Sequence, residues 1–182
     1  EGKRKTPDHA HTVASFCHLM NASKANRKSV VITLGATKSA IDDVRFVQNY
    51  SSGATGFALA DDLHRHGHDV TCVAGVTTVP EPTWLPLVIR ASHPDAMLNE
   101  LMALSNDNID AWIHAAAVLD YVVKGAAEGK IASQQGSLNV ELVEGQKHIL
   151  ALQERCKEAV RIGFKLESGV KQKDLIYRAT AQ

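Results

Sequence analysis

A cluster of hydroxyl and glycine residues occupies positions 51–56, between an apolar stretch and a helical pattern. Ser51 and Ser52 are followed by Gly53 and, three residues later, Gly56. Serine hydroxyls, unhindered glycine backbone and the free N–H groups of a helix start can converge on one point, where the helix dipole also favours negative charge. The segment therefore predicts a phosphate-binding loop. The alternative is a surface loop without a ligand, because a short glycine motif alone is weak evidence.

The elements that must position this loop follow from hydrophobic periodicity. An apolar strand at 30–34, closed by the small turn Gly35-Ala36-Thr37, precedes the loop, and a helix over 57–63 follows it. Further strands are expected at 69–74, 87–90, 109–115, 138–143 and 160–166, and further helices at 94–104, 147–157 and 171–181. This alternation predicts an α/β fold, a Rossmann-like doubly wound and mostly parallel sheet with helices on both faces. In such a sheet, ligands bind beyond the carboxyl ends of the strands.

Length and composition predict how the chain is organised. The 182 residues fit a single domain at 29–182, preceded by a basic extension at 1–28 that holds a short helix over 13–20. A formal net charge of zero provides no global field for nucleic acid or a membrane, and no apolar run reaches the length of a membrane span. The odd cysteines, Cys17, Cys72 and Cys156, suit buried thiols in a reducing compartment, so a cytoplasmic location is expected.

Small residues at the end of the strand at 109–115 predict a second part of the site. Three consecutive alanines, at 115–117, let a flat ring approach the backbone, and Asp120 offers a hydrogen-bond acceptor. Lys130, in the polar connection that follows, supplies positive charge. These features indicate a nucleotide site that carries no redox signature.

Two other kinds of site fit less well. A dinucleotide oxidoreductase usually has an acidic residue at the end of its second strand, where this chain reads Ala-Gly-Val-Thr at 74–77, and the spacing of Tyr121 and Lys124 is one short of Tyr-x-x-x-Lys. A metal site at His64, His66 and His68 lacks ligand spacing.

Five motifs in order resemble those of phosphopantothenoylcysteine synthetase, also called phosphopantothenate–cysteine ligase. They are TLGAT at 33–37, IDDVRFVQNYSSG at 41–53, AAAVLDY at 115–121, GKI at 129–131 and IGFKLE at 162–167. The family is a dimeric, Rossmann-like ligase of coenzyme A biosynthesis. It activates the carboxylate of 4′-phosphopantothenate with a nucleoside triphosphate and Mg²⁺, and cysteine then displaces the nucleotide from the acyl-nucleotidyl intermediate.

The resemblance assigns roles to particular residues. Asn49 and Lys130 are expected in catalysis, the former holding the acyl intermediate and the latter contacting the triphosphate. Arg45, Asn49 and Ala117 are expected to bind phosphopantothenate. The nucleotide-binding residues are expected to be Gly35, Thr37, Ser51, Ser52, Gly53, Gly56, Ala115, Ala116, Asp120, Lys130, Phe164 and Arg178. The metal ligands are not specified, and a homodimer is expected.

The sequence departs from the family pattern in ways that leave alternatives open. Lys-Ile-Ala-Ser at 130–133 replaces the Lys-x-Lys-Lys of many bacterial members, so the nucleotide is CTP or ATP. The final strand of the family is expected to be missing after the helix at 171–181. A nucleotide-binding subunit or regulator that has lost turnover is therefore the alternative function, with an NAD(P)-dependent oxidoreductase behind it.

Overall fold

The computed structural model describes residues 8–23, 25–105, 108–133 and 136–180. The helices are α1 (His9–Asn21), α2 (Ala54–Arg65), α3 (Pro94–Leu104), α4 (His148–Ala151) and α5 (Gln172–Thr180). The strands are β1 (Ser29–Leu34), β2 (Lys38–Ala40), β3 (Phe46–Gln48), β4 (Asp69–Ala74), β5 (Leu87–Arg90), β6 (Ala111–His114), β7 (Tyr121–Val123), β8 (Leu142–Glu144) and β9 (Val160–Gly163).

A five-stranded parallel sheet forms the centre of the molecule, with the strand order β5-β4-β1-β6-β9. Leu34 at the end of β1 lies opposite Ala74 of β4, and Thr33 lies opposite His114 of β6. From β1 the chain first builds the β4–β5 side of the sheet and then the β6–β9 side. The crevice that such a reversal creates lies at the carboxyl ends of β1 and β6, which is where ligands bind in open α/β sheets.

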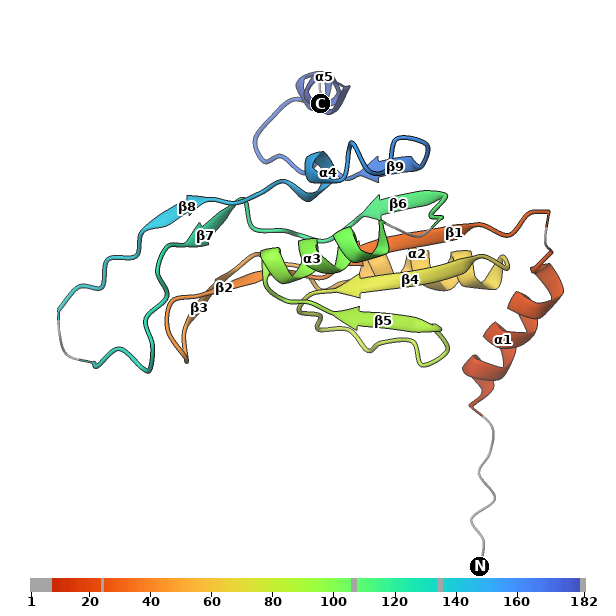
Figure 1. Cartoon of the computed structure of the whole chain (residues 1–182), viewed down its shortest axis with the longest axis horizontal. Helices are drawn as coiled ribbons and strands as arrows, with labels where there is room; N and C mark the ends of the chain where they lie inside the picture. The colour runs from red at the N-terminus through yellow and green to blue at the C-terminus, as the bar shows by residue number, and fades with distance from the viewer. Residues whose placement is uncertain (1–7, 24, 106–107, 134–135, 181–182) are drawn as a thin grey trace, which may run out of the picture.

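Alternate side chains of β1 enter different cores on the two faces of the sheet. Ile32 and Leu34 pack with Phe57 of α2, whereas Val31 packs with Met97 of α3. Figure 1 shows α3 in front of the sheet and α2 behind it. The predicted doubly wound α/β fold is therefore confirmed. Its central strands are apolar at successive positions because helices cover both faces of the sheet.

The loop expected to bind phosphate leads directly into α2, which packs very closely on β1. Gly56 is buried in the first turn of α2, and a Cβ added to it would overlap the Cβ of Leu34. The glycine therefore allows the start of the helix to lie against the end of the strand. This contact sets the position of the α2 N-terminus above the carboxyl edge of the sheet.

Two antiparallel ribbons extend from the carboxyl edge and were not predicted (Figure 1). One pairs β2 with β3, and the other pairs β7 with β8. The predicted strand at 138–143 is wrong in extent and in partner, because only β8 (Leu142–Glu144) forms and it pairs antiparallel with β7, outside the central sheet. Helix 147–157 is also wrong in length: α4 ends at Ala151 and the chain continues in turns. The last strand ends at Gly163 and not at position 166.

The N-terminal helix α1 is longer than the segment predicted at 13–20 and lies against α2. It begins after Asp8, whose carboxylate accepts a hydrogen bond from the N–H of Ala10 at 3.0 Å. At its other end the side-chain amide of Asn21 donates to the carbonyl of Arg65 at 2.8 Å. None of the helices in the described part of the chain is both long and apolar enough to cross a membrane.

Substituting Gly56 tests the close contact between α2 and β1. In an exposed helix, Gly→Ala stabilises by roughly 1 kcal/mol. Gly56→Ala should do the reverse and destabilise by about 1–3 kcal/mol, because the added methyl group overlaps Leu34. Urea unfolding measures the difference, and Ala58→Gly at an exposed position of the same helix serves as the control for propensity alone. Stabilisation by Gly56→Ala would contradict the packing described here.

Candidate functional site

A cavity with a volume of about 660 Å³ lies at the carboxyl edge of the sheet. Its walls come from the ends of β1, β6 and β9, the loop before α2 and the start of α4. The lining residues are Thr33, Asn49, Tyr50, Ser51, Thr55, His114, Ala115, Ala116, Ala117, Val118, Leu119, Asp120, Gln146, Lys147, His148, Ile149, Phe164, Lys165 and Leu166. A cavity of this size accommodates a nucleotide-sized ligand.

The turn after β1 forms the frame beneath this cavity. Ala36 exchanges backbone hydrogen bonds with Val76, donating at 2.9 Å and accepting at 2.7 Å. On its other side, Thr37 N–H donates to the Ala117 carbonyl at 3.1 Å, and Ala117 N–H donates to the Gly35 carbonyl at 2.8 Å. Gly35 has a φ of 76° and a Cβ there would lie 2.5 Å from the Val76 carbonyl oxygen, so only glycine fits. The turn therefore links the strand ends of β4, β1 and β6.

Thr37 also contributes its side chain to the frame. Its hydroxyl Oγ1 accepts a hydrogen bond from Leu119 N–H at 2.8 Å, and the residue is completely buried. Near the end of β1 the hydroxyl of Thr33 does the same, accepting from Ala116 N–H at 3.2 Å. These bonds fix the course of the chain at 115–119 along the cavity.

Asn49 reaches across the cavity wall to the same segment. Its Nδ2 group donates to the carbonyl oxygens of Val118 at 2.9 Å and Ala117 at 3.3 Å. Both amide hydrogens are then engaged with the protein. The Oδ1 atom is left as the part of this side chain that can accept a hydrogen bond from a ligand.

The start of α2 supplies the polar end of the cavity. Ser51 and Thr55 line it, and Gly53 is the N-cap residue without a side-chain hydrogen bond. Ser52 turns away into the loop, since its hydroxyl accepts from Ala54 N–H at 3.3 Å and its carbonyl accepts from Thr78 N–H at 3.1 Å. The first N–H groups of a helix have no partner inside the helix, so this end suits an anion.

The structure brings most of the predicted site residues together and leaves a few outside. Those lining the cavity are Asn49, Ser51, Ala115, Ala116, Ala117, Asp120 and Phe164. Those forming the frame and helix start beneath or beside it are Gly35, Thr37, Ser52, Gly53 and Gly56. Those outside its lining are Arg45, Lys130 and Arg178.

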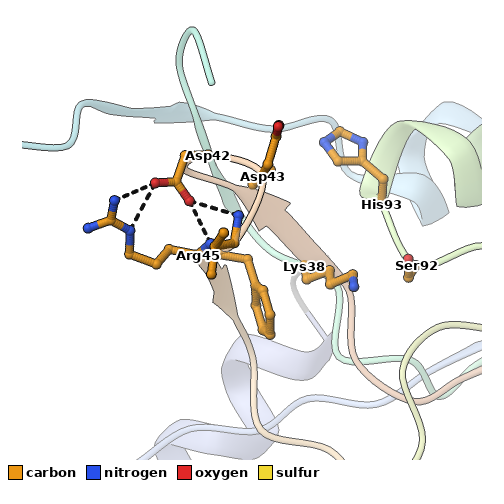
Figure 2. A pocket seen from close by; sticks show the side chains of 9 residues that line it. Lys38, Asp42, Asp43, Arg45, Ser92 and His93 are labelled. Atoms are coloured by element: carbon orange, nitrogen blue, oxygen red, sulfur yellow. Dashed lines mark hydrogen bonds and ion pairs between the residues drawn. The ribbon is translucent and has the colours of Figure 1, made fainter. Parts of the chain in front are cut away.

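Arg45 instead lines a smaller cavity of about 260 Å³, together with Lys38, Asp42 and His93 (Figure 2). Its guanidinium donates to both the Asp42 carboxylate and, at 2.7 Å, the Ile131 carbonyl. Arg178 lies on α5, where it donates to Glu167 at 2.7 Å.

The buried carboxylate of Asp42 organises this neighbourhood. It accepts hydrogen bonds from the N–H groups of Val44 at 2.9 Å and Arg45 at 2.7 Å, and from Ile131 N–H at 3.0 Å. The hydrogen bond from the Arg45 side chain, aided by these backbone donors, lowers the pKa of Asp42 far below its usual range although burial opposes the shift. Asp42 accepts from the backbone N–H of Ile131, and Arg45 donates to its carbonyl. These two bonds hold the backbone next to the exposed Lys130 in place.

Several residues that line the cavity were not predicted from the sequence to belong to the site. Thr55, Gln146, Lys147 and His148 line it, yet His148 reads as part of an ordinary helix start. In the structure His148 is only 5% exposed, and burial lowers its pKa. Asp42 lies within the motif at 41–53, but its role depends on Ile131, which is distant in sequence.

Replacing Asp42 tests how the connection around Lys130 is held. Asp42→Asn removes the charge that Arg45 contacts. It also replaces one acceptor oxygen by an NH2 group, which cannot accept from the backbone N–H groups around it, so the segment near Ile131 should come away from position 42 more often. We expect tryptic cleavage after Lys130 to accelerate on the order of tenfold, because cleavage requires local opening. The exposed neighbour Asp43→Asn is the matched control. Equal cleavage of wild type and Asp42→Asn would show that the carboxylate does not hold this segment.

The partly buried ring of His114 predicts an acid sensitivity of folding. Burial, then His148 and Arg161, lower its pKa from 6.5 to about 4. Between pH 4 and 6.5 the folded state therefore binds fewer protons than the unfolded state. The contribution of the neutral ring to the free energy of unfolding is complete above pH 6.5 and declines as the pH falls toward 4. Between pH 7.5 and pH 5, wild type should lose about 2 kcal/mol more unfolding free energy than His114→Gln. Denaturant titrations at both pH values measure this, with the exposed His66→Gln as control. Parallel losses in wild type and His114→Gln would refute it.

Comparison with known proteins identifies the family of this architecture. Residues 25–181 match the family described as the DNA/pantothenate metabolism flavoprotein C-terminal domain. The coenzyme A biosynthesis bifunctional protein CoaBC of Thermococcus kodakarensis is 32% identical over 183 residues, which cover 100% of this chain and 45% of the relative. Its Bacillus subtilis counterpart is 33% identical over 141 residues, 78% of this chain and 34% of the relative. The chain thus spans less than half the length of these relatives.

A solved structure agrees. The crystal structure of the C-terminal domain of a coenzyme A biosynthesis bifunctional protein CoaBC superimposes with a TM-score of 0.71 at 28% identity, covering 87% of this chain and 74% of that one. The synthetase-family resemblance of the five motifs is confirmed by these matches. The chain therefore belongs to the family of the DNA/pantothenate metabolism flavoprotein C-terminal domain.

Proposed function

We propose that this chain is a phosphopantothenate–cysteine ligase, which joins 4′-phosphopantothenate to cysteine with CTP or ATP as co-substrate. The observation that carries the proposal is the cavity at the carboxyl ends of β1, β6 and β9, because it gathers Asn49, Ser51, Asp120 and Phe164 from motifs far apart in the sequence. The family match and the relatives in coenzyme A biosynthesis support the same reaction.

The chemistry requires an activated carboxylate. A carboxylate is a poor acyl donor, so its oxygen attacks the α-phosphorus of the nucleoside triphosphate and pyrophosphate leaves, giving an acyl-nucleotidyl anhydride. The cysteine amine then attacks the acyl carbon, and the nucleoside monophosphate leaves as the amide forms. The site must stabilise charge on the phosphates and shield the anhydride from water.

Residues of the cavity suit these needs. The start of α2 with Ser51 and Thr55 provides N–H and hydroxyl donors for phosphate oxygens. Ala115, Ala116 and the ring of Phe164 provide a flat apolar surface for the nucleobase. Mg²⁺ is usually held by phosphate oxygens and one or two carboxylates, and Asp120 is a carboxylate that lines the cavity. When bound, Mg²⁺ would offset charge on the leaving pyrophosphate.

We also propose a homodimer. Its support is the pair of ribbons, which expose Phe46, Tyr121 and Leu142 to solvent at 50%, 57% and 44%. Contacts through the ribbons and the connection at 122–137 would place Arg45 and Lys130 near a ligand that is bound between subunits.

The reaction itself tests the proposal. The purified chain is incubated with 4′-phosphopantothenate, cysteine, Mg²⁺ and either CTP or ATP, and pyrophosphate and phosphopantothenoylcysteine are quantified, the latter by mass spectrometry. We expect both products in equal amounts with at least one nucleotide. Nucleotide binding without product would indicate the non-catalytic subunit instead. Tight binding of NAD(P)H, without nucleoside triphosphate binding, would indicate an oxidoreductase.

Lys130→Ala should raise the Michaelis constant for the nucleotide and lower turnover without unfolding the protein, because the side chain is exposed and supports no core. Loss of one charge-assisted contact corresponds to about 1.5–3 kcal/mol, or roughly 10–150-fold. Steady-state kinetics and thermal unfolding provide the measurements. Lys124→Ala, which removes an exposed lysine that pairs with Glu141, is the control from the same connection. Unchanged kinetics would make Lys130 a surface residue.

Asn49→Asp should separate activation from amide formation. The substitution keeps Oδ1 but loses the Nδ2 donor and sets a carboxylate oxygen against the carbonyls of Ala117 and Val118. The repulsion should displace the segment at 117–118 and Asn49 Oδ1, so pyrophosphate release should persist in part while amide formation falls by about 10²-fold, the scale for a misplacement of about 1 Å near the reacting atoms. Quenched-flow mass spectrometry distinguishes acyl nucleotide from product. A product yield like that of wild type would reduce Asn49 to a turn residue.

A further inference from the structure

Buried ring nitrogens without partners occur in the wall of the larger cavity. In the described ranges, four buried side-chain nitrogens have no hydrogen-bond partner: His64 Nδ1, Trp112 Nε1, His114 Nε2 and His148 Nδ1. His114 and His148 both line the cavity, whereas His64 and Trp112 do not. Leaving a buried polar atom unpaired costs free energy, so such atoms call for an explanation, and a ligand that supplies the missing partner is one.

The two histidines approach this wall from different elements. His114 ends β6, where it lies opposite Thr33 of β1 and Gly163 of β9, the residue before Phe164. His148 begins α4. Trp112, two residues before His114 on the same strand face, packs with Met97 of α3, so the His114 ring lies on the sheet face opposite α2.

This position separates the histidines from the phosphate end of the cavity. Ser51 and Thr55 mark the end near the start of α2, on the other face of the sheet. Phe164, 58% exposed, follows Gly163, the strand partner of His114, and the alanines at 115–117 continue directly from His114, so both are next to His114 along the backbone. A nucleotide with its phosphates at α2 would carry its base across the sheet edge toward the imidazoles.

Burial favours the uncharged form of both imidazole rings, because it lowers their pKa values. Burial is the largest cause that lowers the pKa of His148, and it lowers the pKa of His114 to about 4. A neutral imidazole presents one N–H donor and one bare nitrogen acceptor. It therefore suits the uncharged polar edge of a heterocycle better than a phosphate, which favours cations and N–H clusters.

We propose that His114 and His148 recognise the nucleobase of the co-substrate through hydrogen bonds from their ring nitrogens. The inference rests on the proposed function, since it assigns the base-binding part of that same site. For His114, turning the ring by half about its Cβ–Cγ bond exchanges its nitrogens with carbons at almost constant volume, so the enclosed Nε2 can turn to meet a ligand. The ring of His148 has a hydrogen bond with the backbone of Pro94, which leaves its Nδ1 for a ligand. Phe164 would then stack on the face of the base while the histidines read its edge.

Paired substitutions test the hydrogen bonds separately from packing. His114→Leu and His148→Leu keep an apolar side chain of similar size, whereas His114→Gln and His148→Asn restore a polar atom near the unpartnered Nε2 and Nδ1, respectively. Isothermal titration with CTP, ATP and inorganic tripolyphosphate, each with Mg²⁺, compares probes with and without a base. His66→Leu, at an exposed position of α2's C-terminal end, is the control.

The leucine variants should bind the preferred nucleotide about 5–30-fold more weakly, the scale for one or two neutral hydrogen bonds, and bind tripolyphosphate as wild type does. His114→Gln and His148→Asn should recover most of that loss. Unchanged nucleotide affinity in both leucine variants, or equal weakening for tripolyphosphate, would overturn base recognition and leave the ligase proposal standing. A wild-type protein that binds neither CTP nor ATP would overturn both.

Discussion

The backbone hydrogen bonds of Ala36 and its neighbours are the constraint on which the site depends. Ala36 pairs with Val76 on one side, and the flanking residues Gly35 and Thr37 pair with Ala117 on the other. All three residues of this turn are buried, so their backbone N–H and C=O groups cannot bond to solvent and need partners within the protein. The pairing therefore joins three strand ends beyond the point where the sheet itself stops.

Two walls of the cavity are attached to this frame, the segment at 115–119 and the loop before α2. The segment at 115–119 donates N–H groups to the hydroxyls of Thr33 and Thr37 and accepts a hydrogen bond from Asn49, so the loop before α2 and the end of β6 are positioned against each other. A separate anchor at Asp42 holds the chain beside Lys130. The loop before α2, proposed to bind phosphate, and the alanines proposed to face the base are thus held by contacts that require no ligand, which is the arrangement expected of a preorganised site.

The sequence was sufficient to predict the central sheet because β1, β4 and β6 are apolar runs whose side chains enter the cores on both of its faces. It was insufficient for the β7–β8 ribbon. Each of its strands has only three residues, which is too short for a hydrophobic pattern, and they are strands because they pair with each other. The short α4 was overestimated for a related reason: Leu152 and Cys156 are buried at helical spacing, yet the chain between them forms turns.

The candidate site was predictable where a motif carries its own chemistry, as with Ser51 and Asp120, and not where a role arises only from packing. His148 is an ordinary residue in the sequence, and only the structure shows that it is buried and lines the cavity. Asp42 is similar, since its partner Ile131 is 89 residues away.

Amide hydrogen exchange of the ligand-free protein tests most directly whether the frame exists before any substrate binds. We expect slow exchange, limited by global unfolding, at the N–H groups of Ala36, Thr37, Ala117 and Leu119, because each is hydrogen-bonded within the frame. Adding nucleotide should change these rates little. Fast exchange at these amides in the free protein, slowed only by nucleotide, would contradict a preformed site and show that the ligand assembles it.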